Sequence, residues 1–135
     1  MKVAKRALSI ILVFTICFAL AITVSAYNLT RKGSVTLNGG DYSVTSSGYG
    51  GNHGKGRLYN REESAGDAVL TLQLSTGNGW TEYSRVTCAP GEEKDTAVWG
   101  RADTDYLFRV TVTSSQWYLF GNPGRVAYGY VYTGL

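Results

Sequence analysis

The chain has 135 residues, of which 44% are hydrophobic and 17% charged, and its formal net charge is +3. Lys2, Lys5 and Arg6 supply that surplus, because the other ten basic residues are balanced by ten acidic ones. Binding of nucleic acid or anionic lipid by charge needs a surplus or a cluster of positive residues, and beyond residue 6 we find only the pair Arg31-Lys32. The composition therefore argues against both partners.

Residues 1–26 read as an export signal. Their three basic residues precede an apolar run from Ala7 to Val24, and Val24-Ser25-Ala26 offers small residues for cleavage. We therefore predict a signal peptide at 1–26 and a secreted domain at 27–135. The alternative is an uncleaved anchor that keeps the domain at the cell surface, because the run approaches membrane-spanning length.

The 109 residues beyond the signal suit one domain with one core. Only Cys88 remains there, so no disulfide can form within the chain. We expect Cys88 to be buried and unreactive, at the end of a strand on the side of Val86, and the protein to be a monomer. A disulfide between two chains is the alternative.

Apolar and polar residues alternate with period two through most of this domain, which predicts strands. In chain order the expected strands are Ser34–Leu37, Tyr42–Ser47, Arg57–Asn60, Asp67–Ser75, Trp80–Thr87, Thr96–Arg101, Tyr106–Ser114, Trp117–Phe120 and Arg125–Thr133. Glycine- and proline-containing turns separate them, among them 77–79, 89–92 and 121–124. The fold class predicted is all-β: one antiparallel β-sandwich or small barrel of eight or nine strands. Its expected core residues are Leu70, Leu72, Leu74, Phe108, Val110 and Val112.

The segment Ser47–Asn60 holds five glycines and the only histidine. It fits no phosphate loop, because Gly54-Lys55 is followed by glycine and no helix is expected to open after it. We expect a mobile, exposed connection beside the functional surface; a plain linker between strands is equally consistent with the sequence. Its candidate ligand-binding residues are Tyr49, His53, Lys55 and Arg57.

No catalytic, metal or cofactor motif stands out. Cys88 and His53 are the strongest candidates for a catalytic nucleophile and its base. However, Cys88 ends a strand before a turn, where a buried and unreactive residue is common. One histidine and one cysteine disfavour zinc, and the paired acidic residues (62–63, 92–93, 103 and 105) look like solvated turns. We therefore expect a protein that is not an enzyme and takes no cofactor or metal.

Ten tyrosines and three tryptophans lie beyond the signal, more than a small core can bury. Exposed Tyr and Trp give large contact area at low entropic cost. Trp80, Tyr118, Tyr128 and Tyr130 are therefore further candidate ligand-binding residues. The function predicted is a secreted binding module for a cell-wall or surface polymer, or for a protein.

Residues 97–102, Ala-Val-Trp-Gly-Arg-Ala, precede an alternating aromatic strand. This stretch resembles the later half of lactococcin-type bacteriocins, which are secreted, disulfide-free β-sandwich proteins that attack wall synthesis in rival bacteria. The resemblance covers a few residues and assigns no functional residue. It implies an antimicrobial function as the alternative to a binding module.

Overall fold

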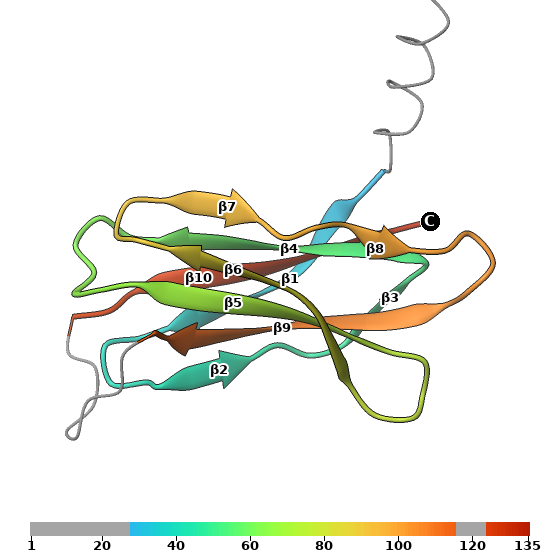
Figure 1. Cartoon of the computed structure of the whole chain (residues 1–135), viewed down its shortest axis with the longest axis horizontal. Coiled ribbons are helices and arrows are strands. Elements are labelled where there is room, and N and C mark those ends of the chain that lie inside the picture. The colour runs from blue at the N-terminus through green and yellow to red at the C-terminus, as the bar shows by residue number, and fades with distance from the viewer. Residues whose placement is uncertain (1–27, 116–123) are drawn as a thin grey trace, which may run out of the picture.

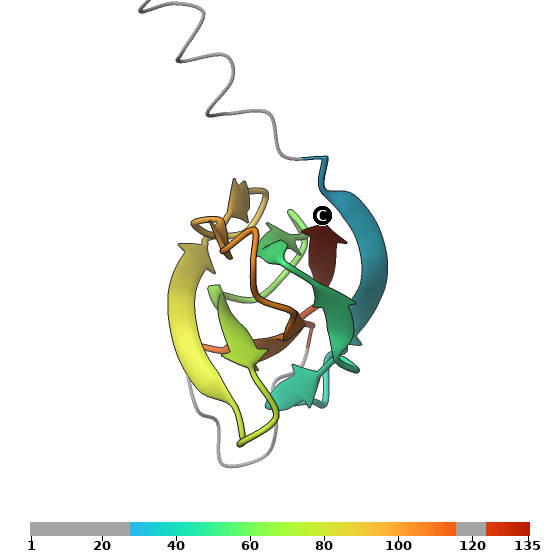
Figure 2. The same cartoon turned by 90° about the vertical axis from the view of Figure 1, so that its right-hand side faces the viewer.

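A computed structural model describes residues 28–115 and 124–135. These residues form ten strands and no helix, arranged as two antiparallel sheets packed face to face (Figures 1 and 2), as the alternation predicted. The predicted signal peptide, the strand 117–120 and Tyr118 lie outside the described residues. The strands are β1 (Thr30–Leu37), β2 (Ser43–Thr45), β3 (Tyr49–Gly51), β4 (His53–Asn60), β5 (Ala68–Ser75), β6 (Thr81–Cys88), β7 (Glu93–Asp95), β8 (Trp99–Gly100), β9 (Tyr106–Ser114) and β10 (Ala127–Gly134).

The two sheets have matching layouts. Sheet A has the order β1-β10-β4-β7, with β8 also paired to β4. Sheet B has the order β2-β9-β5-β6, with β3 also paired to β9. Within the described residues, no helix is long and apolar enough to span a membrane.

The core lies between the sheets and uses alternate residues of the long strands. Five of the six expected core residues are fully buried, whereas Leu74 is only partly so. The pairing of β5 with β6 shifts register between Leu72 and Gln73, because Tyr83 of β6 is an extra, unpaired residue, and such a bulge bends β6 beside Leu74.

The glycine-rich segment is not the mobile connection that we expected. Its residues form β3 and β4, which only Asn52 separates. β3 pairs with β9 in sheet B, and β4 pairs with β10 in sheet A, so the chain changes sheets here. Gly51 permits this crossing, because a Cβ there would lie 3.0 Å from the Thr133 Cβ and 3.1 Å from the Gly134 carbonyl oxygen.

Three further glycines leave part of the inner side of sheet A without side chains. A Cβ at Gly54 would lie 2.6 Å from the ring of Phe108, and one at Gly56 would lie 2.6 Å from Leu70 Cδ2. Gly129, on the neighbouring β10, would meet the side chain of Val112 in the same way. We call Gly54, Gly56 and Gly129 the glycine patch. They let the large side chains of sheet B pack directly onto the backbone of sheet A.

Burial of Cys88 agrees with the prediction. Its side chain is fully buried at the end of β6, and its thiol donates a hydrogen bond of 3.5 Å to the carbonyl of Leu58. Burial raises the pKa of this thiol, which disfavours the reactive thiolate. Val86, expected on the same side, is partly buried against the core.

Other element boundaries differ from expectation. β3 and β7 were not expected, and the strand predicted at 96–101 reduces to Trp99–Gly100. The predicted turns at 77–79 and 89–92 are confirmed by the positive φ angles of Gly77, Gly79 and Gly91.

Because Gly56 belongs to the glycine patch and Gly50 does not, alanine substitutions at the two positions should change the free energy of unfolding by different amounts. Gly56→Ala should lower the free energy of unfolding by about 1–3 kcal/mol, because the new methyl overpacks against Leu70 and Val110. Gly50→Ala, a matched control in β3, should be neutral or slightly stabilising, because its Cβ would have no neighbour within 4 Å. Urea unfolding followed by tryptophan fluorescence measures both. Equal stabilities would contradict the packing described here.

Candidate functional site

The outward side of sheet A carries four of the eight tyrosines in the described part of the chain. We call this surface the tyrosine face. Its members on β4 and β10 alternate with buried residues, and the strand register brings residues of β1 and β7 beside them. They are Tyr59, Tyr128, Tyr130, Tyr132, Arg31, Lys55, Arg57, Glu93 and Asp95. The four tyrosines are partly exposed, because one side of each lies on the sheet and no other described element covers them.

Two tyrosines stack at one end of the face. Tyr59 and Tyr128 are direct cross-strand partners, and their ring centroids lie 6.2 Å apart with an interplanar angle of 7°. Such a pair adds stability to the sheet beyond the area that it buries.

Cations lie over the other two rings. The guanidinium carbon of Arg31 is 5.1 Å from the centroid of the Tyr130 ring. Lys55 Nζ and Arg57 Cζ are each 5.3 Å from the centroid of the Tyr132 ring. These cation–π contacts hold long side chains flat on the sheet.

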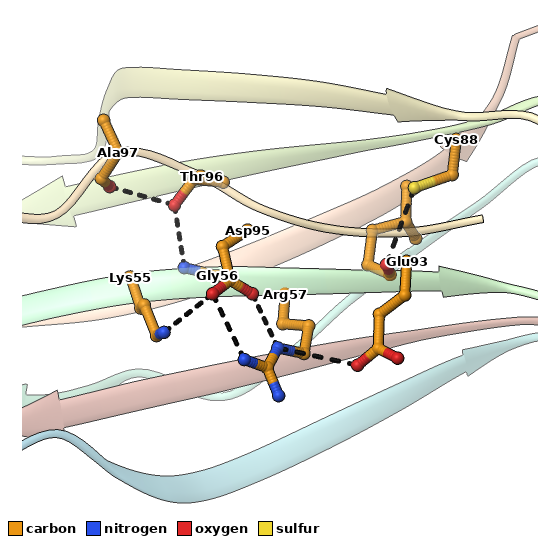
Figure 3. Close-up of polar contacts among 9 residues, drawn as sticks. Lys55, Gly56, Arg57, Cys88, Glu93, Asp95, Thr96 and Ala97 are labelled. Carbon is orange, nitrogen blue, oxygen red and sulfur yellow. Dashed lines mark hydrogen bonds and ion pairs between the residues drawn. The ribbon is translucent and has the colours of Figure 1, made fainter.

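One carboxylate of the edge strand β7 organises the charged part of the face, as Figure 3 shows. Asp95 accepts hydrogen bonds from Lys55 Nζ at 2.8 Å and from Arg57 Nε and Nη2 at 2.6 and 3.2 Å. Glu93 lies 3.6 Å from Arg57 Nε. The hydrogen bond from Arg57 is the main cause that lowers the pKa of Asp95, and the same bond raises the pKa of Arg57.

Backbone pairing fixes this cluster. Asp95 stands directly opposite Arg57 in the β4–β7 ladder. Oγ1 of the next residue, Thr96, accepts a hydrogen bond from the amide of Gly56 at 2.9 Å (Figure 3). Thr96 also donates its own amide to the Gly56 carbonyl at 2.9 Å. Asp95 is therefore held in place by the same part of β4 that carries the glycine patch.

Four of the predicted ligand-binding residues meet on the tyrosine face: Lys55, Arg57, Tyr128 and Tyr130. His53 shares the outward side of β4 but is only 8% exposed, with Nδ1 2.7 Å from the Asn52 side-chain oxygen. We therefore leave His53 out of the proposed ligand surface.

Two other predicted residues lie elsewhere. Tyr49 packs against the core, in the space that the missing side chain of Gly33 leaves. Trp80 lies with sheet B, where its ring is 4.2 Å from the guanidinium carbon of Arg109. The predicted set is thus divided between two sheets, and Tyr118 lies outside the described part of the chain.

Sequence reasoning missed several members of the face. Tyr59 follows the alternation Lys55, Arg57, Tyr59, so its side of the strand could have been read from the sequence. Asp95 carries no such signal, because its partner Arg57 is 38 residues away and residues 92–95 look like a polar turn. Tyr132 follows the candidates Tyr128 and Tyr130 in the alternation of β10, so its side of the strand could also have been predicted from the sequence.

The nucleophile–base pair does not form. His53 begins β4, whereas the thiol of Cys88 contacts Leu58 near its end. Five residues of strand separate these points by roughly 16 Å. Among the residues described, no group of three or more His, Cys, Asp and Glu side chains could hold a metal ion.

The stretch that resembles a bacteriocin has a structural role at its centre. Trp99 packs against the core, with its ring centroid 4.6 Å from that of Tyr83 and 6.4 Å from that of Tyr106.

Comparison with known proteins does not assign this chain to a family. No protein-family model matches the chain, and no curated protein matches it. Solved structures with a similar arrangement include PirA, at 12% identity and a TM-score of 0.46, covering 74% of this chain and 90% of that chain. Another is the PBSX exported protein XepA, at 20% identity and a TM-score of 0.48, covering 79% of this chain and 37% of that one. A third is the Yersinia pseudotuberculosis-derived mitogen, at 14% identity and a TM-score of 0.41, covering 82% of this chain and 88% of that one. With TM-scores below 0.5, these likenesses assign no function.

The ion pairs of Asp95 predict how stability depends on pH. The folded-state pKa of Asp95 lies below its ordinary value of 3.8, so its pairing stabilises the fold above that pH and is lost as pH falls through the lower folded value. Asp95→Asn, which does not titrate, should therefore be less stable than the unmodified protein near neutral pH. The difference should shrink below about pH 3.8. Urea unfolding at pH 7 and pH 2.5 tests this, and a difference that does not depend on pH would contradict it.

Proposed function

We propose that this protein is an exported, non-enzymatic binding module that uses the tyrosine face to hold a polymer of the cell surface. The observation that carries the proposal is the row of partly exposed tyrosines on adjacent strands β4 and β10, with cations lying over them. The export signal predicted at residues 1–26 supports the location. The distance between His53 and Cys88 supports a binding role over catalysis by that pair.

The shape of the face suits an elongated ligand. Tyr128, Tyr130 and Tyr132 occupy alternate positions of one strand, so their attachment points span roughly 13 Å in a line. Tyr59 extends the platform sideways onto β4. A linear polymer can contact several of these rings at once, and each added contact raises affinity at a small further cost in entropy.

The composition of the face favours a polymer over a protein partner. The centre of a protein–protein interface is depleted in Lys, Asp and Glu. Here Lys55 stands on the inner strand β4, directly opposite Tyr132, and Asp95 and Glu93 flank it from the edge strand β7. Among the described residues, the exposed large hydrophobic side chains lie elsewhere: Tyr42, Tyr83, Val98, Leu107 and Leu135.

Retention on isolated cell walls tests the proposal. The unmodified protein should sediment with walls, and Tyr130→Ala and Tyr132→Ala should each weaken this by about tenfold, because a buried ring contributes on the order of 1.5 kcal/mol. Trp80→Ala is the matched control, since it removes an aromatic ring from the other sheet and should leave retention unchanged. Circular dichroism confirms that each variant is folded.

Three results would contradict the proposal. The protein could fail to sediment with walls at any salt concentration. Trp80→Ala could weaken retention while the tyrosine variants do not. Retention could also disappear when the walls are stripped of protein, which would identify a protein partner instead.

A further inference from the structure

Besides its aromatic rings, the tyrosine face carries a charged cluster formed by Lys55 and Arg57 of β4 and by Glu93 and Asp95 of the edge strand β7. Beside the row of tyrosines lies a hollow of about 410 Å³, lined by Arg57, Glu93, Lys94 and Asp95. The side chains of Lys55 and Asp95 are 20% and 35% exposed, so a ligand on the face can reach them. A ligand on the tyrosine face would therefore meet this cluster as well as the rings.

The charges of the cluster are already matched within the protein. Lys55 and Arg57 are opposed by Asp95 at 2.8 and 2.6 Å, and Arg57 also by Glu93 at 3.6 Å. Next to them, Lys94 pairs with Glu92 at 2.9 Å. A polyanion gains affinity by neutralising cations and releasing counterions, and cations that carboxylates already pair offer little of this gain.

The same cluster is well suited to hydroxyl groups. A hydroxyl both donates and accepts hydrogen bonds, so two neighbouring hydroxyls can bond an ammonium or guanidinium and the carboxylate beside it. Ionised donors and acceptors make the stronger hydrogen bonds. The backbone pairing of Arg57 with Asp95 holds the charged groups before the ligand arrives, which lowers the entropic cost of binding.

We infer that the ligand of the tyrosine face is an uncharged polysaccharide, with two neighbouring hydroxyls of one sugar bound at Asp95 and its two cations and the same sugar packed beside Tyr132. This inference rests on the proposed function and narrows it to one class of polymer. Asp95 orders Lys55 and Arg57 and accepts a hydrogen bond from the sugar.

A panel of soluble probes tests the inference by affinity electrophoresis and calorimetry. The neutral probes are β-glucan, xylan, galactan and mannan, and the anionic probes are polygalacturonate and polyglycerol phosphate. At least one neutral probe should bind, and its affinity should change by less than about twofold when ionic strength rises tenfold, since an uncharged ligand is not screened. The anionic probes should bind more weakly.

Two variants and one control make the test specific to the cluster. Asp95→Asn should weaken binding of the neutral probe about tenfold and strengthen binding of polygalacturonate, because Lys55 loses its paired carboxylate and Arg57 keeps only the more distant Glu93. Lys55→Gln should weaken neutral binding without any gain for the polyanion. Glu82→Gln is the control, because Glu82 forms a similar two-point ion pair with Arg85 on sheet B, at 3.1 and 3.0 Å. It should bind every probe as the unmodified protein does.

Different results would contradict the neutral polysaccharide ligand and the proposed function. Binding to an anionic probe alone, with an affinity that falls steeply with salt, would overturn the neutral ligand while leaving a surface polymer as the partner. Retention on walls without binding to any neutral probe would overturn it as well. The proposed function itself would be contradicted only if the unmodified protein were not retained on walls, or if Tyr130→Ala and Tyr132→Ala were retained as well as the unmodified protein.

Discussion

The close approach of the two sheets at the glycine patch is the constraint on which the rest of the structure depends. Phe108 and Leu70 of sheet B occupy the space where side chains of residues 54 and 56 would stand. A small domain without an intrachain disulfide must obtain its stability from packing, and large side chains against bare backbone give dense packing with few residues. Glycine weakens a strand by its backbone entropy, and here packing offsets that loss.

This inner constraint also fixes the outer surface. Because side chains alternate along β4, the inward positions of Gly54 and Gly56 place Lys55 and Arg57 outward, next to Tyr132 and Tyr130 of β10. The hydrogen bonds between Gly56 and Thr96 then hold Asp95 beside both cations. One segment of eight residues therefore connects the core to the proposed ligand surface.

The sequence allowed the fold class and most of the core to be predicted, because the alternation in β5, β9 and β10 is strong. It misled at β3 and the first half of β4, where glycine was taken as a sign of flexibility, whereas the strand predicted at Arg57–Asn60 is confirmed as the second half of β4. The reason for the glycines lies in Phe108 and Leu70, which are more than ten residues away in the sequence. The sequence also could not assign Trp80 and Tyr130 to different sheets, since that depends on strand order. The partnership of Asp95 with Arg57 was hidden for the same reason, because it is set by the pairing of β4 with β7.

Amide hydrogen exchange of residues 53–60 tests most directly whether the glycine-rich segment is a central strand that positions the tyrosine face. Gly56 donates its amide to Thr96 Oγ1 and Asn60 donates its amide to the Glu92 carbonyl, and β4 is flanked by β10 and by β7 and β8. These amides should be protected to within about tenfold of those in the centre of β5 and β9, since all of them open with the core. Exchange of the whole segment at the rate of an unprotected loop would show that neither the glycine patch nor the face built on it exists in solution.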